Sequence, residues 1–282
     1  MTASDPVSAS NTSDLTPADA QRSSVKCPLR YFRLTVSYDG KEFAGWQWQT
    51  KQRTVQETLE HALAKVTGQQ IRVAASGRTD AGVHAIAQGV SFCCETRLDA
   101  DAIRRALNTK LPNDMVVVEV RDAPFGFHAT RDAVRKRYRY VVQDGPVRDL
   151  FARPYAWWVR KQLDAEAMHR AAQQLLGFHD FRSFQSTGSS RICTERTILD
   201  ISVERRRIDL SDRVIIEVEA DGFLYNMVRN IAGTLVAVGK GKQPESWVAE
   251  VLAARNRRSA GEAAPPQGLF LLQVWFEEDA HD

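Results

Sequence analysis

The sequence predicts an α+β fold made of two halves with similar element order. Apolar residues that alternate with a period of two indicate strands, and apolar residues spaced three or four apart indicate helices between them, so each half follows the order β-α-β-β-α-β. Of the 282 residues, 43% are hydrophobic and 26% are charged, which is typical of folded domains. Antiparallel sheets with helices packed on one face are therefore expected.

In the first half, alternation from Tyr31 to Tyr38 predicts a half-buried strand that ends at Asp39 and Gly40. Thr54 followed by Glu57 is a capping box, so a helix is predicted from there to Gly68. The other predicted elements of this half are strands at 71–75, 86–92 and 115–121 and a helix that begins at Asp99.

The second half repeats this order more loosely. Its predicted elements are strands at 135–143, 155–159, 197–205, 213–220 and 269–276, and helices at 164–176, at 223–238 and just after Pro244. Residues 1–28 are rich in Ser, Thr, Ala and Asp and have no apolar stretch, so we expect a disordered tail and no secretory signal. The predicted domains are 29–125 and 126–282.

Charge and cysteine usage narrow the function classes. The net charge is +3 overall, but residues 29–276 hold 36 basic and 28 acidic residues, a net +8. That balance is compatible with a polyanionic partner, although a solvated basic face would also explain it. No apolar run is long enough to span a membrane. The four cysteines lack metal-ligand spacing, and no glycine-rich nucleotide loop is present, so we expect no metal, no cofactor and a cytoplasmic protein.

Three stretches are candidates for function. The first is the Gly-bounded loop at 76–85, which contains Arg78, Asp80 and Gly82. An Asp followed two residues later by Gly is most often only a turn, in which the Asp side chain caps backbone N–H groups. The neighbouring guanidinium of Arg78 favours an ionised Asp80, which makes a catalytic role worth considering.

The second stretch, residues 135–140, alternates basic and aromatic side chains along a predicted strand. Tyr138 and Tyr140 are expected on one face, and Arg135, Arg137 and Arg139 on the other. Aromatic rings for stacking beside cations for phosphates suit an extruded nucleotide. A tyrosine ladder with a hydrated basic back explains the same pattern.

The third stretch, residues 221–230, leads into a very apolar helix. Arg229 lies between Val228 and Ile231 and is therefore expected to be buried, and a buried guanidinium is seldom left without a carboxylate partner. A structural ion pair with a local acid such as Asp221 is the simpler explanation.

Together these stretches make the chain resemble the tRNA pseudouridine synthase A family, from residue 31 to residue 276. The matching segments are Tyr38-Asp39-Gly40 with Phe43, Gly45, Gln47 and Gln49, then residues 77–85, 136–140, 227–233 and 264–269. The resemblance implies two ferredoxin-like (βαββαβ) halves, with antiparallel sheets flanking a basic cleft and helices on the outer faces. It also implies a homodimer that binds tRNA and isomerises uridine to pseudouridine at positions 38, 39 and 40 of the anticodon stem-loop, without cofactor or metal.

By the same resemblance, Asp80 is the catalytic nucleophile, Arg229 is its carboxylate partner and Arg78 helps to displace the target base. Tyr138 stacks on the uracil, and Arg135, Arg137 and Arg139 are candidate RNA contacts. The loop at 76–85 contains one carboxylate, which suits isomerisation better than a retaining hydrolysis that needs two. Attack at C1′, attack at C6 and loss of the C2′ proton all stay open. A non-catalytic tRNA-binding module or RNA chaperone on the same fold is the competing hypothesis.

Overall fold

A computed structural model describes residues 28–188, 193–208 and 211–277, so the tail predicted at 1–28 falls almost entirely outside the described residues. The strands are β1 (Leu29–Tyr38), β2 (Ala74–Ala75), β3 (His84–Glu95), β4 (Met115–Ala123), β5 (Ala133–Asp144), β6 (Trp157–Val159), β7 (Gly177–Asp180), β8 (Glu195–Ile208), β9 (Ser211–Ala220) and β10 (Leu269–Phe276). The α-helices are α1 (Val55–Thr67), α2 (Ala100–Asn108), α3 (Ala165–Ala172), α4 (Met227–Gly239) and α5 (Trp247–Ala254). The predicted α+β class is confirmed.

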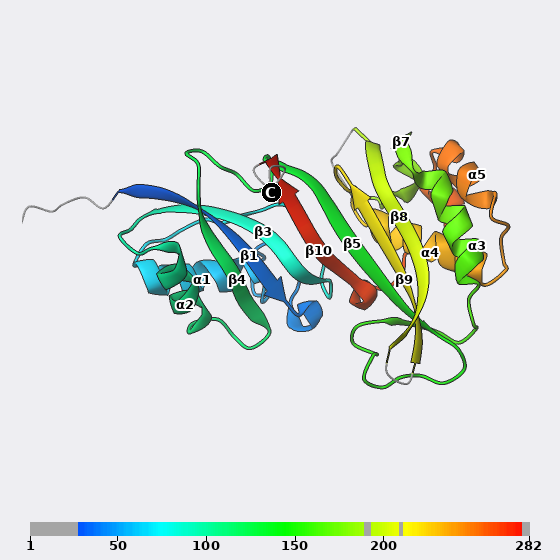
Figure 1. The fold of residues 1–282 in the computed structure, drawn as a ribbon, viewed down its shortest axis with the longest axis horizontal. Helices are drawn as coiled ribbons and strands as arrows, with labels where there is room; N and C mark the ends of the chain where they lie inside the picture. Colours follow the sequence, from blue (N-terminus) through cyan, green and yellow to red (C-terminus); the bar gives the residue numbers. More distant parts are fainter. Residues whose placement is uncertain (1–27, 189–192, 209–210, 278–282) are drawn as a thin grey trace, which may run out of the picture.

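The strands form one sheet rather than the two expected from the sequence. Its order is β4-β1-β3-β10-β5-β9-β8-β7, with β2 on β3 and β6 on β5. Strand β10 joins the halves, because it runs antiparallel to β5 and pairs in parallel with β3 at Phe270 and Leu271 (Figure 1). A pairing between the last strand and the first half is long-range, so strand periodicity could not reveal it.

The two halves share one strand arrangement. In the first half, β4 lies beside β1, β1 beside β3, and β3 beside β2. In the second half, β10 lies beside β5, β5 beside β9, and β9 beside β8. If β5, β8, β9 and β10 are counted as strands one to four of the second half, both halves have the same spatial order of strands, 4-1-3-2. The sequence expectation of two copies of one element order agrees with this arrangement.

The helices gather toward the two ends of the sheet, with α1 and α2 near β1 and β4, and with α3 against β8 and α4 and α5 packed on α3 (Figure 1). Helix α4 is the central one, since 11 of its 13 residues are buried. The local signals at the start of α1 and α2 are confirmed. Thr54 accepts a hydrogen bond from the backbone N–H of Glu57, and Asp99 accepts one from Ala102. Gly68 ends α1 in the left-handed conformation.

Several predicted boundaries were wrong. The strand predicted at 71–75 contains only Ala74 and Ala75, because the backbone N–H of Val73 donates to the Glu60 side chain of α1 instead of to a strand. Helix α4 begins four residues later than predicted, after Asn226 in a left-handed conformation. Strand β7 was not predicted at all. Within the described ranges, no helix is long and apolar enough to cross a membrane.

Candidate active site

A cavity of about 1590 Å³ lies between the two halves. It is lined by the loop at 76–81 and the first turn of α1 from the first half, and by residues 221–229, which lead into α4, from the second. Lys136 and Tyr138 of β5 line it as well. The charged residues of the lining have both signs, and they are Arg78, Lys136, Arg196 and Arg229 with Asp80, Glu195 and Asp221. The lining itself is therefore only slightly basic.

A buried polar network holds the loop at 76–81 in place. The hydroxyl groups of Tyr38 and Thr79 lie 2.8 Å apart, and the side-chain amide of Gln88 donates to the carbonyl oxygen of Gly77 at 2.7 Å. On the other side, the backbone N–H of Trp46 donates to the Thr79 carbonyl at 2.9 Å. The loop is thus fixed on both sides of the residue that precedes Asp80, which restricts where the carboxylate can point.

Asp80 and Arg229 come from opposite halves and meet in the cavity. Arg229 Nη1 lies 3.6 Å from Asp80 Oδ2, and their side chains are 16% and 35% exposed. The alternative partner Asp221 instead accepts a hydrogen bond from the backbone N–H of Thr197. Arg229, expected to be buried, is partly buried, and the carboxylate that it faces is that of Asp80.

Two oxygen atoms of the second half hold the Arg229 side chain. Its Nε donates to the carbonyl oxygen of Ala264 at 2.7 Å, and its Nη1 donates to Asn226 Oδ1 at 2.8 Å. The backbone N–H of Ala264 also donates to the Arg229 carbonyl at 3.1 Å. Neither Asn226 nor Ala264 was singled out by sequence reasoning. The available signal for Asn226 was its position three residues before Arg229, where side chains on a helix meet.

The pKa of Asp80 depends more on burial than on the nearby positive charge that the sequence led us to expect. Burial raises the pKa of the Asp80 carboxyl group, and the nearby positive charge of Arg229 lowers it by a smaller amount, so the pKa lies above its ordinary value of 3.8. Arg229 thus acts in the expected direction without outweighing desolvation. The 3.6 Å separation, longer than a good hydrogen bond, is consistent with this result.

Tyr138 lies at the cavity wall and is 7% exposed. Its ring packs edge-on against Phe223 with 4.9 Å between centroids. Burial, together with the neighbouring Tyr38 and Asp80, raises the pKa of Tyr138 well above its usual value of 10.0, so its hydroxyl is neutral. This places an aromatic ring and the Asp80 carboxylate in one pocket, as the family resemblance implied.

Arg78 also lines the cavity, but its side chain is exposed. It forms no hydrogen bond or ion pair with any residue that the structure describes. Its guanidinium is therefore available to a ligand. Within the same described ranges, no group of three or more His, Cys, Asp or Glu side chains is placed to hold a metal ion.

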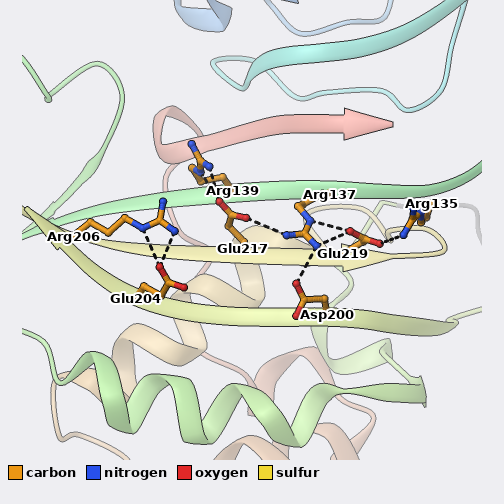
Figure 2. Close-up of polar contacts among 8 residues, drawn as sticks. All are labelled: Arg135, Arg137, Arg139, Asp200, Glu204, Arg206, Glu217 and Glu219. Atoms are coloured by element: carbon orange, nitrogen blue, oxygen red, sulfur yellow. Dashed lines mark hydrogen bonds and ion pairs between the residues drawn. The ribbon is translucent and has the colours of Figure 1, made fainter. Parts of the chain in front are cut away.

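Arg135, Arg137 and Arg139 do not line the cavity. They project from the other face of β5 toward carboxylates of β9 and β8, as Figure 2 shows. The pairs are Arg135 with Glu219, Arg137 with Glu217, Glu219 and Asp200, and Arg139 with Glu217. The alternation of the two faces was correctly predicted. The acidic partners lie 63 or more residues away along the chain and so could not be read from the stretch itself.

Sequence comparisons with known proteins match this chain to tRNA pseudouridine synthases. The sequence profile of the tRNA pseudouridine synthase family matches residues 34–130 and 171–277. A tRNA pseudouridine synthase A of Halalkalibacterium halodurans is 47% identical over 242 residues, covering 86% of this chain and 90% of the relative. One of Thermoanaerobacter sp. (strain X514) is 43% identical over 246 residues, covering 87% and 99%. One of Acetivibrio thermocellus is 40% identical over 249 residues, covering 88% and 100%.

The fold and these matches define an RNA-modifying isomerase. The chain belongs to the tRNA pseudouridine synthase family, and its similar relatives carry the name tRNA pseudouridine synthase A. The resemblance that the sequence motifs indicated is therefore confirmed.

Proposed function

We propose that the chain converts uridine to pseudouridine in the anticodon stem-loop of tRNA, at positions 38, 39 and 40, with Asp80 as the nucleophile. The observation that carries the proposal is the meeting of Asp80, Arg229 and Tyr138 in one cavity built from both halves. In this proposal the halves, 29–125 and 126–282, are two ferredoxin-like domains that share β10. The cleft between them accepts one arm of the tRNA.

The reaction breaks the bond from uracil N1 to C1′ of the ribose and makes a new bond from C5 to the same carbon. It needs one ionised nucleophile and a means of keeping the detached base. Asp80 supplies the first, and the ring of Tyr138 supplies a surface over the uracil for the second. The nucleophile can act at C1′, act at C6 or promote loss of the C2′ proton. The loop at 76–81 brings a single carboxylate, that of Asp80, to the cavity, which favours isomerisation over a hydrolysis that needs a closely spaced pair.

The target base must leave its stack to reach Asp80, at a cost of a few kcal/mol that is smallest near loops. A cavity of about 1590 Å³ exceeds the roughly 300–1000 Å³ of small-molecule pockets, so it suits an extruded nucleotide together with its neighbours. Arg78, exposed and without an intramolecular partner in the described residues, is proposed to enter the space that the base leaves.

Further contacts belong to the same proposal. In this proposal three side chains of β5 bind tRNA phosphates: Arg135, Arg137 and Arg139. To do so, each gives up its ion pair with a carboxylate of β8 or β9. Phosphate contact at these three side chains is therefore expected to depend strongly on salt. We propose, from the family resemblance, that the enzyme works as a homodimer in the cytoplasm and needs neither a cofactor nor a metal.

The decisive experiment maps pseudouridine in unmodified tRNA transcripts after incubation with wild-type and Asp80→Asn protein. We expect Asp80→Asn to bind tRNA with unchanged affinity and to form no pseudouridine, because the amide keeps the shape and removes the charge. Asp101→Asn, which changes an exposed carboxylate of α2 outside the cavity, is the matched control and should keep full activity. Tight tRNA binding without any pseudouridine from wild-type protein would instead establish the competing tRNA-binding module.

A further inference from the structure

Asn226, the left-handed residue that precedes α4, contacts the guanidinium of Arg229. We propose that Asn226 is a positioning residue, whose side-chain amide holds Arg229 so that the guanidinium faces Asp80. The inference rests on the proposed function, since it assigns a supporting residue to the same reaction. The role it assigns to Asn226 is exerted through Arg229, whose guanidinium donates to the amide oxygen of Asn226.

The backbone of Asn226 is unusual for the residue that begins a helix. Such residues are normally extended, and their side chains accept a hydrogen bond from the first turn. Asn226 has φ 58° and ψ 14°, and its side chain caps nothing. Its carbonyl oxygen nevertheless accepts from the N–H of Asn230 at 2.9 Å, so it begins α4. Among the described residues other than glycine, only Lys51 and Arg255 share a positive φ.

Because the Asn226 side chain makes no capping hydrogen bond, its amide oxygen is available to bind Arg229. Asn226 Oδ1 accepts from Arg229 Nη1 at 2.8 Å, and this same nitrogen lies 3.6 Å from Asp80 Oδ2. The contact with Asp80 is longer than a good hydrogen bond, so it constrains the guanidinium less than the two shorter bonds do. These run from Nη1 to Asn226 at 2.8 Å and from Nε to Ala264 at 2.7 Å.

The chemistry of the amide matches this task. An amide oxygen is a neutral acceptor, so it holds the guanidinium without cancelling the charge that Asp80 experiences. Asparagine also tolerates the left-handed conformation better than most residues with a Cβ atom. Glycine would meet the backbone requirement alone. Aspartate would meet both geometric requirements but would place a second negative charge on Arg229.

The test is Asn226→Gly, which keeps the backbone conformation and removes the acceptor. We expect kcat for pseudouridine formation to fall by about 10- to 100-fold, as expected for a misplaced reacting group, with KM for tRNA within about twofold. The acid limb of the kcat profile should move to higher pH, because a displaced Arg229 lowers the pKa of Asp80 less. Arg255→Gly makes the same backbone-type change at the end of α5, outside the cavity, and should leave kcat and the pH profile unchanged.

A second variant, Asn226→Asp, keeps the shape of the side chain and so remains informative if Asn226→Gly is unstable. It should show a kcat below that of wild type. The acid limb of its kcat profile should lie at higher pH than that of Asn226→Gly, because the added carboxylate offsets the positive charge of Arg229 and so raises the pKa of Asp80 further. Wild-type kcat and pH profile in either variant would overturn the inference. Inactive wild-type protein would instead overturn the proposed function, so measuring wild type and Asp80→Asn alongside separates the two failures.

Discussion

Replacing Gly233 of α4 by Ala tests whether close packing behind Arg229 maintains the site. A Cβ atom at Gly233 would lie 1.7 Å from the carbonyl oxygen of Glu262 and 2.9 Å from its carbonyl carbon. Because real Cβ atoms essentially never come within 3.0 Å of another atom, the backbone near Glu262 must retreat by about 1.3 Å. No side-chain rotation can relieve the contact, since both atoms belong to the main chain.

The displaced segment carries one of the two anchors of Arg229. Ala264, two residues after Glu262, accepts from Arg229 Nε at 2.7 Å. A shift of about 1 Å would take this bond past the length at which it still counts as a hydrogen bond. Gly233→Ala should therefore act on the catalytic geometry as well as on folding.

The expected loss of stability combines three contributions. Overpacking costs about 1–3 kcal/mol, and loss of a hydrogen bond to a charged group costs about 1.5–3 kcal/mol. The better helix propensity of Ala returns about 1 kcal/mol. A net loss of about 3 kcal/mol, at roughly 2–4 °C per kcal/mol for a chain of this size, lowers Tm by about 6–12 °C.

Gly239→Ala provides a matched control in the same helix. Its Cβ would lie 2.5 Å from Sδ and 2.8 Å from Cγ of the buried Met168, so a side chain rather than the main chain must move. Thermal denaturation and pseudouridine formation below both transitions compare the two variants. Gly233→Ala should lose more Tm and at least about tenfold in turnover, whereas Gly239→Ala should keep wild-type turnover. Equal Tm losses, or full turnover in Gly233→Ala, would refute the reasoning.

Two further outcomes follow from the pocket. Tyr138→Phe should keep most of the turnover and Tyr138→Leu should lose it, because the hydroxyl forms no hydrogen bond within the described residues whereas the ring lines the cavity. Equal losses in a single-turnover assay would assign the role to the hydroxyl. Because burial raises the pKa of Asp80, the folded state binds this proton more tightly than the unfolded state, and ionisation opposes folding as the pH rises through the folded pKa. Asp80→Asn should therefore raise Tm at pH 7, and the gain should vanish below pH 3.8, so a lower Tm at pH 7 would contradict the desolvation argument.

The fold could be predicted wherever neighbouring residues decide the structure. The strand that ends at Tyr38 and the helix between Thr54 and Gly68 follow from alternation and from capping groups within a few residues. What failed depends on distant partners. Strand β2 shrinks because Glu60 takes the N–H of Val73, and the two sheets become one because β10 pairs with β3.

The same division applies to the site. The sequence predicted that Arg229 would be buried and would need a carboxylate, and this followed from the apolar helix alone. It could not choose between Asp80 and Asp221 from the residues, because that choice depends on how the halves meet. It also could not predict the ion pairs of Arg137 with Glu219 and of Arg139 with Glu217, because these pairs form between neighbouring strands β5 and β9.

The arrangement around Arg229 explains how one carboxylate can be both ionised and reactive in the proposed reaction. A carboxylate bound directly by a guanidinium is stabilised, but its lone pairs are occupied by hydrogen bonds. At 3.6 Å, Arg229 supplies positive charge while its short hydrogen bonds go to Asn226 and Ala264. Burial raises the pKa of Asp80 at the same time, which makes its oxygen more basic. Moving the guanidinium closer would therefore favour ionisation at the expense of nucleophilicity.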